Sequence, residues 1–124
     1  MFDIKNTTSV KPKISFEKIK VSVLGSKYEL SLVLMGDTLA TRLNKEHKKK
    51  DGPTNILSFP LSETEGEIFL NLRRAQRDAK KFDHSIKEHI TFLFIHGCLH
   101  LKGLAHGEKM EKEETRLLKK FSHS

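Results

Sequence analysis

One segment, residues 85 to 103, constrains the fold of this chain more than any other. It reads SIKEHITFLFIHGCLHLKG, and Ser85 and Glu88 have the spacing of a capping box at the start of a helix. Apolar residues recur at helical spacing and also fill most of the positions between, so few faces of the helix are polar. Gly103 can take the left-handed conformation that ends many helices. We therefore predict a helix from Ser85 to about Lys102 that is buried on nearly all sides.

The rest of the chain contains both strand and helix patterns. Leucines alternate in ELSLVLM, which predicts a strand over residues 29–35. Two shorter strands are predicted over residues 56–60 and 67–70, and the first lies at or near a sheet edge because Pro60 cannot donate a ladder hydrogen bond. Alternating valines make a strand the alternative to a helix for residues 14–24. Helices are predicted over residues 14–24, 38–47, 72–81 (with Asn71 as its cap) and 108–121.

Length and charge narrow the class of protein. The 124 residues are expected to form one domain, residues 1–124, and a formal net charge of +7 favours a polyanionic partner such as RNA, DNA or an acidic membrane face. The alternative is that the charge serves solubility alone. Cys98 is the only cysteine, which fits a reducing cytoplasm. No signal peptide or membrane span is expected, because the apolar runs are far shorter than the ~20 residues that a span needs.

Three histidines at the end of the predicted central helix indicate a metal site. His96 and His100 are four residues apart and project from one helix face, and the turn at Gly103 can return His106 as a third ligand. Three neutral imidazoles with an open fourth position are typical of a catalytic centre, in which the ion activates water, rather than of a structural one. Zinc is the default ion, and nickel or another divalent ion is the alternative.

The alternative to a shared metal site is that these histidines are separate surface or core residues. The chain has 7 histidines, and the four outside the cluster are predicted to be ordinary, mostly solvated residues. These four are His47, His84, His89 and His123. Of the four, His89 lies seven residues before His96 on roughly the same helix face. Cys98 points away from His96 and is predicted to be a small buried hydrophobic residue.

The spacing HxxxHxxxxxH also occurs in metzincin proteases, which use a glutamate after the first histidine as general base. In this chain that position is Gly97, so a protease of that mechanism lacks its base. The same metal geometry is therefore predicted to act on a different substrate. A phosphodiester would require cationic help at the site, because it already carries a negative charge.

Two motifs resemble a known family. HGCLHLKGLAH resembles the HGxLHLxGyDH signature of the YbeY-type single-strand-specific endoribonucleases, the bacterial rRNA maturation factors. LNKEHKKKDGPTNILSFP, residues 43–60, resembles their LNxxyRgkdxPTnVLSFP, and GEI at 66–68 resembles their GDI. The resemblance covers roughly residues 29–121, and the N-terminal part has no match.

The resemblance implies an α+β fold, with a small mixed sheet of about four strands and helices packed around the central metal-binding helix. It implies one metal ion, usually zinc, on His96, His100 and His106. The implied activity is hydrolytic cleavage of single-stranded RNA in the maturation of the 3′ end of small-subunit rRNA and in ribosome quality control. The implied partners are rRNA, the small ribosomal subunit and its assembly factors, in the cytoplasm.

Two positions depart from the family pattern. Lys48 stands where the family has an arginine, so the charge remains but the planar fork that grips phosphate is lost. Ala105 stands where the family has an aspartate before the third histidine, and loss of such an outer partner typically costs ~10–100-fold in metal affinity or activity. Lys48 is the candidate for stabilising charge in the transition state, and Ser58 is a candidate substrate contact.

The candidate substrate contacts also have interpretations that involve no substrate. Lys48 is otherwise a solvated member of its KKK run, and Ser58 a strand serine bonded to backbone. A basic helix face is more simply solvated than phosphate-binding; its members are Arg73, Arg74, Arg77, Lys80 and Lys81. Two rival functions follow: a metalloprotease-like hydrolase of small substrates, and a non-catalytic ribosome-assembly factor that keeps a metal for structure.

Overall fold

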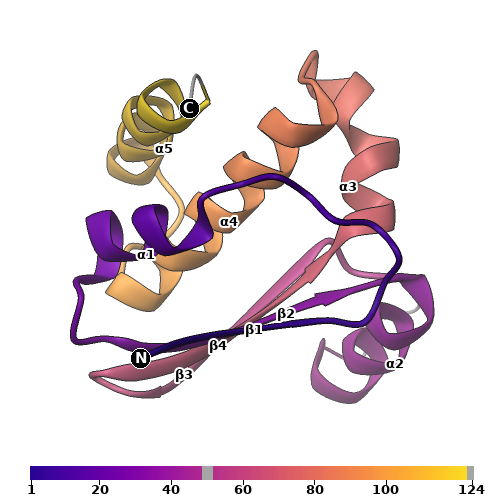
Figure 1. Cartoon of the computed structure of the whole chain (residues 1–124), viewed down its shortest axis with the longest axis horizontal. Coiled ribbons are helices and arrows are strands. Elements are labelled where there is room, and N and C mark those ends of the chain that lie inside the picture. The colour runs from indigo at the N-terminus through magenta and orange to yellow at the C-terminus, as the bar shows by residue number, and fades with distance from the viewer. Residues whose placement is uncertain (49–51, 123–124) are drawn as a thin grey trace.

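The computed structural model of the chain describes residues 1–48 and 52–122, and this part contains a four-stranded mixed sheet with helices on both faces (Figure 1). The strands are β1 (Phe2–Asn6), β2 (Glu29–Met35), β3 (Ile56–Ser62) and β4 (Glu65–Asn71). Their order is β1-β2-β4-β3; β1, β2 and β4 are parallel, and β3 is antiparallel to β4. The helices are α1 (Phe16–Leu24), α2 (Asp37–Lys48), α3 (Leu72–Asp78), the 3-10 turn η1 (Ala79–Phe82), α4 (Ile86–Lys102) and α5 (Glu108–Phe121). The α+β fold expected from the sequence is confirmed.

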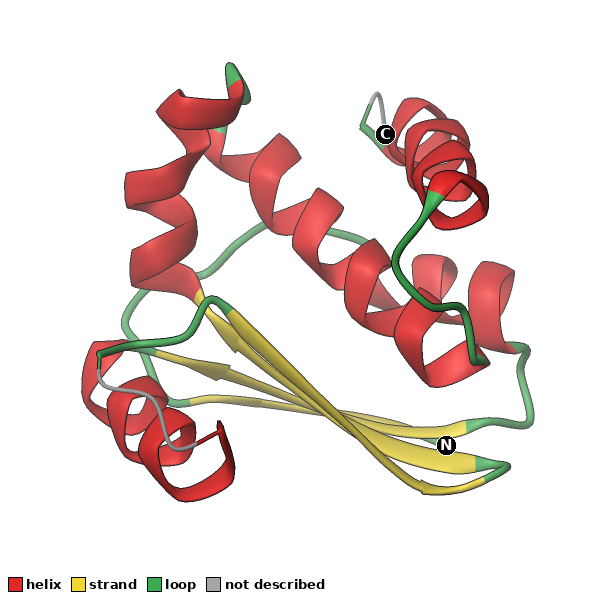
Figure 2. Cartoon of the chain, turned by 180° about the vertical axis from the view of Figure 1, so that it is seen from behind, coloured by secondary structure: helices red, strands yellow, loops and turns green. Residues whose placement is uncertain are grey.

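Alternation along the strands divides the apolar residues between the two faces of the sheet. Leu30, Leu32 and Leu34 of β2 point to one face and join the main core beneath α4. A smaller core on the opposite face joins α2 to the sheet through Leu43 and Leu57. Figure 2 shows α4 crossing the sheet as the central helix, with α2 at the other side of the sheet.

The central helix has the ends that the sequence predicts. Ser85 accepts a hydrogen bond from the Glu88 amide, and the Glu88 carboxylate accepts one from the Ser85 amide, so the capping box is present. Gly103 ends the helix with φ 107°, and its amide donates to the carbonyls of Leu99 and His100. Helices α1, α3 and α5 all pack against α4. The burial of α4 on nearly all sides is therefore confirmed.

Of the remaining element predictions, one is wrong at one end, and the structure contains one strand that was not predicted. The predicted helix over residues 72–81 is wrong at its end, because α3 stops at Asp78 and the chain tightens into η1 before a left-handed turn at Asp83 with φ 55°. Its cap is correct, since the Asn71 side chain accepts from the amides of Arg73 and Arg74. Strand β1 was not predicted; the exposed residues that follow Phe2 carry little alternation, and pairing with β2 forms the strand.

The prediction that His89 is mostly solvated is wrong. Its side chain is only 1% exposed. The reason is η1, which brings the Phe82 ring over His89 with a centroid distance of 5.0 Å. His84 is half-buried and faces His89, whereas His47 is exposed beside the Phe59 ring; His123 lies outside the described residues.

Cys98 is fully buried as predicted, and burial raises the pKa of its thiol, so the group stays protonated.

Among the helices of the described residues, none has the length and apolar character needed to cross a membrane.

Candidate metal centre

The structure brings His96, His100 and His106 together at the C-terminal end of α4. His96 and His100 lie one turn apart on the helix, and the turn at Gly103 reverses the chain so that His106 faces them. The ring centroids of His106 lie 5.1 Å from His96 and 4.7 Å from His100. One nitrogen from each ring lies within 4.8 Å of the others. The three residues therefore form a compact group of imidazole nitrogens.

This group fits a divalent cation. Three nitrogens bound tetrahedrally to one zinc at about 2.0–2.1 Å lie roughly 3.4 Å from one another. The Nε2 atoms of His96 and His100 are 3.0 Å apart, so small side-chain movements suffice to reach such a spacing. Burial, followed by the neighbouring His96 and His106, lowers the pKa of His100. Its imidazole is therefore neutral at pH 7, which is the form that binds a metal.

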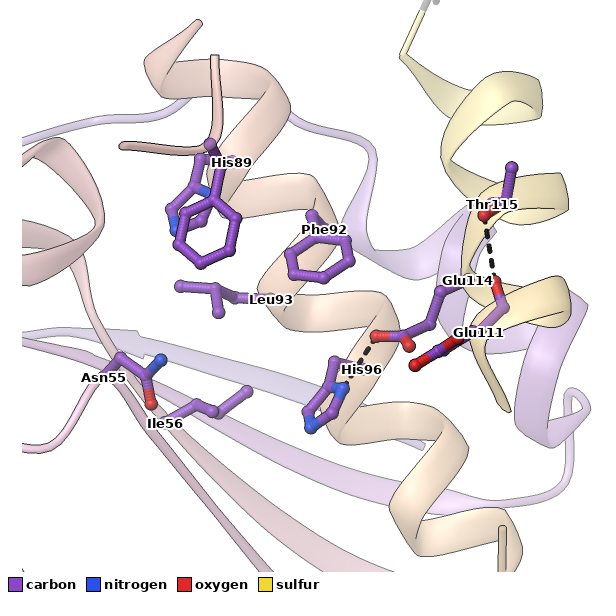
Figure 3. A pocket seen from close by; sticks show the side chains of 10 residues that line it. Asn55, Ile56, His89, Phe92, Leu93, His96, Glu111, Glu114 and Thr115 are labelled. Carbon is purple, nitrogen blue, oxygen red and sulfur yellow. Dashed lines mark hydrogen bonds and ion pairs between the residues drawn. The ribbon is translucent and has the colours of Figure 1, made fainter. Parts of the chain in front are cut away.

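A carboxylate that the sequence analysis missed orients the first histidine. The His96 Nδ1–H donates to Glu114 Oε2 at 2.7 Å, and Figure 3 shows Glu114 reaching from α5 toward His96. Because Nδ1 carries the proton, Nε2 keeps its lone pair for a ligand and faces His100. Ala105, in the loop between α4 and α5, offers no carboxylate, and the carboxylate that contacts the cluster is that of Glu114 on α5.

The position of Glu114 on its helix indicates from the sequence that its carboxylate is buried and paired. Met110 and Leu117 are buried on one face of α5, and Glu114 lies on the same face, four residues after the first and three before the second. Glu114 is only 7% exposed. An acidic residue on the apolar face of an amphipathic helix requires a buried partner. Spacing alone does not indicate which histidine that partner is.

Replacing Glu114 by glutamine is expected to weaken metal binding by roughly 10–100-fold, the usual effect of losing an outer partner of a ligand histidine. The amide keeps the size of the side chain but removes the charge that holds Nδ1–H of His96. Competition of wild type and variant against a chelating dye of known affinity measures the change. Glu113→Gln is the matched control because Glu113 pairs with Arg116 and does not contact the histidines. Equal metal affinities for Glu114→Gln and wild type would contradict the role.

Gly97 permits close contact between α4 and the sheet. A Cβ atom at this position would lie 2.8 Å from Ile56 Cδ1, 3.1 Å from Ile68 Cδ1 and 3.1 Å from Ser58 Oγ. The residue after the first histidine therefore faces β3 and β4. The protein has no space there for the glutamate that a metzincin uses as its base.

Lys48 and Ser58 lie on the same cavity as the three histidines. The cavity has a volume of about 670 Å³, and its other wall residues are His47, Asn55, Ile56, Leu57, Phe59 and Pro60. Lys48 is exposed at the end of α2. The Ser58 hydroxyl donates to the Gly97 carbonyl over a long 3.4 Å. The structure thus places both predicted substrate contacts beside the histidines, and their roles stay predictions.

Most basic side chains of α3 and η1, the segment predicted as a basic helix, form ion pairs. Arg74 and Lys81 pair with Asp78, and Arg77 pairs with Asp37 at 2.7 Å. Asp37 also accepts a hydrogen bond from Asn71, which links the starts of α2 and α3. These contacts support the simpler interpretation of a solvated helix face rather than a phosphate-binding one.

The family model and the curated relatives agree on one family, and a solved structure shares the fold. The family model described as Endoribonuclease YbeY matches residues 4–122. A protein named Endoribonuclease YbeY from Helicobacter pylori (strain Shi470) is 36% identical over 131 residues, covering 98% of this chain and 92% of its own length. One of the same name from Carboxydothermus hydrogenoformans is 37% identical over 95 residues, covering 73% of this chain and 64% of its own length. A solution structure from Thermotoga maritima has a TM-score of 0.71 at 20% identity, covering 96% of this chain and 87% of that one.

Proposed function

The chain belongs to the YbeY endoribonuclease family, and we propose that it is a metal-dependent endoribonuclease that hydrolyses phosphodiester bonds in single-stranded RNA. The observation that carries this proposal is the convergence of three imidazoles on one cavity that also contains Lys48. Among the described residues that form its wall, none is a carboxylate. An anionic substrate is therefore favoured over a peptide, whose hydrolysis at such a site normally uses a glutamate base.

His96, His100 and His106 are proposed to hold one divalent ion, with zinc as the default and nickel or another divalent ion as the alternative. Bound there, such an ion would supply a Lewis acid and lower the pKa of water so that it can act as a nucleophile at neutral pH. Glu114 fixes the orientation of His96. A set of three histidines leaves a coordination position for water or substrate, as in catalytic rather than structural zinc sites.

Lys48 and Ser58 are proposed to bind the substrate. The Lys48 ammonium stabilises negative charge that develops on the phosphate, and its compact charge does so without the bidentate geometry of an arginine. The Ser58 hydroxyl contacts a phosphate or ribose oxygen, because its bond to the Gly97 carbonyl is long and easily exchanged. Both side chains lie on the cavity wall that contains the histidines.

The family also supports a biological setting. We propose that the substrate is the 3′ end of small-subunit rRNA, that the protein acts in ribosome quality control, and that its partners are the small subunit and assembly factors. These processes would place it in the cytoplasm, with residues 1–124 acting as one unit. The formal net charge of +7 is consistent with an RNA partner.

Metal removal tests the proposal. Protein stripped with a chelator and then dialysed is expected to leave a single-stranded RNA pool intact, and addition of zinc, nickel or manganese in turn is expected to restore cleavage with one of them. Duplex RNA and a peptide pool serve as parallel substrates. Cleavage of peptides with RNA left intact would favour the protease-like rival. Binding of RNA without cleavage under every metal would favour the non-catalytic assembly factor.

A further inference from the structure

A second cavity adjoins the histidine cavity and has a different chemistry. It lies between η1, α4 and α5, has a volume of about 490 Å³, and shares Asn55, Ile56 and His96 with the first. Its remaining wall residues are Phe82, His89, Phe92, Leu93, Glu111, Glu114 and Thr115. Figure 3 shows Glu111 and Glu114 on the α5 side and Phe92 and His89 on the α4 side. No part of the function proposed so far uses this cavity beyond the contact of Glu114 with His96.

A row of aromatic rings on the wall of this cavity ends at His96, a candidate metal ligand. Phe82 stacks on His89 at 5.0 Å with an interplanar angle of 26°, and His89 stacks on Phe92 at 5.9 Å with an angle of 25°. The Phe92 ring lies 6.4 Å from the His96 ring. Phe82 is 55% exposed, which is unusual for a phenylalanine and leaves ring surface available to a ligand.

On the wall of this cavity, one buried ring nitrogen and one side-chain amide make no hydrogen bond within the described residues. The His89 Nε2 atom is buried and makes no hydrogen bond, although its Nδ1 lies 3.2 Å from His84 Nδ1. A buried polar atom without a partner is costly, so a ligand or water that satisfies it is favoured. The side-chain amide of Asn55, a half-buried residue, borders both cavities and makes no hydrogen bond to another described residue.

The charge of the wall disfavours a phosphate. Glu111 and Glu114 are the charged residues among the described wall residues, and no lysine or arginine accompanies them. The wall of the first cavity has the opposite charge, because it contains Lys48 and none of its described residues is a carboxylate. The second cavity therefore suits a flat, uncharged group with hydrogen-bond donors on its edge.

We propose that this second cavity is a nucleobase subsite, in which a base next to the scissile phosphate stacks on Phe82 and Phe92 and hydrogen-bonds to Asn55. The inference rests on the proposed endoribonuclease function and adds how the strand is held. Stacking on aromatic side chains is the general means by which proteins hold unpaired bases, and it is open only to a strand whose bases are not paired. The subsite thus gives a physical reason for a preference for single-stranded RNA.

The test replaces Phe82 by alanine and measures KM and kcat for a single-stranded RNA, together with equilibrium binding of the same RNA in the presence of a chelator. The loss of one stacked base is expected to raise KM and the dissociation constant by roughly 5- to 150-fold. Phe82→Trp keeps the ring and is expected to retain binding. Ile86→Ala is the matched control, because Ile86, the first residue of α4, is also a large exposed apolar residue (47%) but does not form part of the cavity wall.

An RNA with one abasic nucleotide, moved stepwise along the strand around the cleavage position, locates the base. At one position the abasic RNA is expected to bind wild type as weakly as intact RNA binds Phe82→Ala, and the two changes together are expected to cost no more than either alone. Unchanged binding and cleavage by Phe82→Ala would overturn the subsite and leave the endoribonuclease intact. Equal losses for Ile86→Ala and Phe82→Ala would overturn it as well. RNA binding that depends on Phe82 without cleavage would support the subsite and count against the nuclease.

Discussion

His100→Ala is expected to lose both bound metal and RNA cleavage. His100 is the middle member of the cluster, with its ring 4.5 Å from His96 and 4.7 Å from His106. Its removal leaves two imidazoles, which bind a divalent ion far more weakly than three. The loss should exceed the roughly 10–100-fold that follows removal of an outer hydrogen-bond partner. Metal analysis of the purified protein and cleavage of single-stranded RNA, measured on the same samples, check this result.

Thermal unfolding provides a third readout for His100→Ala that does not depend on catalysis. Binding of an ion to the folded state alone raises the melting temperature, so added zinc should stabilise wild type and not the variant. His84→Ala removes a histidine outside the cluster and is expected to leave the metal content unchanged. Full metal content in His100→Ala would show that the ligand set is wrong. Loss of metal with unchanged cleavage would show that the nuclease activity comes from a contaminant.

The parts of the site that were predictable from the sequence are those set by local chain geometry. The four-residue spacing of His96 and His100 fixes their common face, and Gly103 ends the helix through its own backbone freedom. The capping box acts within a single turn. Family membership also confirms the resemblance seen in the two motifs. None of these inferences depends on how the helices pack against one another.

The parts that could not be predicted depend on contacts between distant segments. Glu114 is 18 residues from His96 and meets it only because α5 packs across α4. His89 is buried because η1 carries Phe82 over it, and the tight turn that places η1 has no strong sequence signal. Strand β1 is formed by pairing with β2 rather than by its own pattern. Tertiary packing outweighed the local tendency in each case.

In the proposed function, the two adjoining cavities would bind different parts of a nucleotide, because their walls differ in charge. Lys48 and the histidines border the cavity that suits a phosphate, whereas Glu111 and the aromatic rings border the cavity that suits a base. His96 and Asn55 belong to both walls, so the cavities adjoin, and the proposal places the phosphate of a nucleotide in one and its base in the other. A duplex would keep its bases stacked and paired, and would therefore reach only the first cavity.

Gly97→Glu is expected to destabilise the protein severely and to confer no peptidase activity. The substitution recreates the metzincin pattern in sequence, but the position faces the sheet, where even a Cβ atom would lie 2.8 Å from Ile56 Cδ1. Overpacking of a core typically costs about 1–3 kcal/mol, and burial of an unpaired carboxylate costs several kcal/mol more. Together these costs consume much of the roughly 5–15 kcal/mol by which a domain is stable. Denaturant unfolding and cleavage of a peptide pool measure the two outcomes.

Gly97→Ala separates the steric cost of this substitution from the cost of the charge. Alanine brings the same close contact with Ile56 but gains roughly 1 kcal/mol of helix propensity over glycine, so a net loss of about 0–2 kcal/mol is expected. A Gly97→Glu protein as stable as wild type would show that α4 can move away from β3 and β4, and the close packing would then not explain the glycine. If that protein also cleaved peptides through the intact histidines, the site would differ from a protease only in the missing base. The present structure predicts the opposite, because the side chain at position 97 faces Ile56, Ile68 and Ser58 of the sheet.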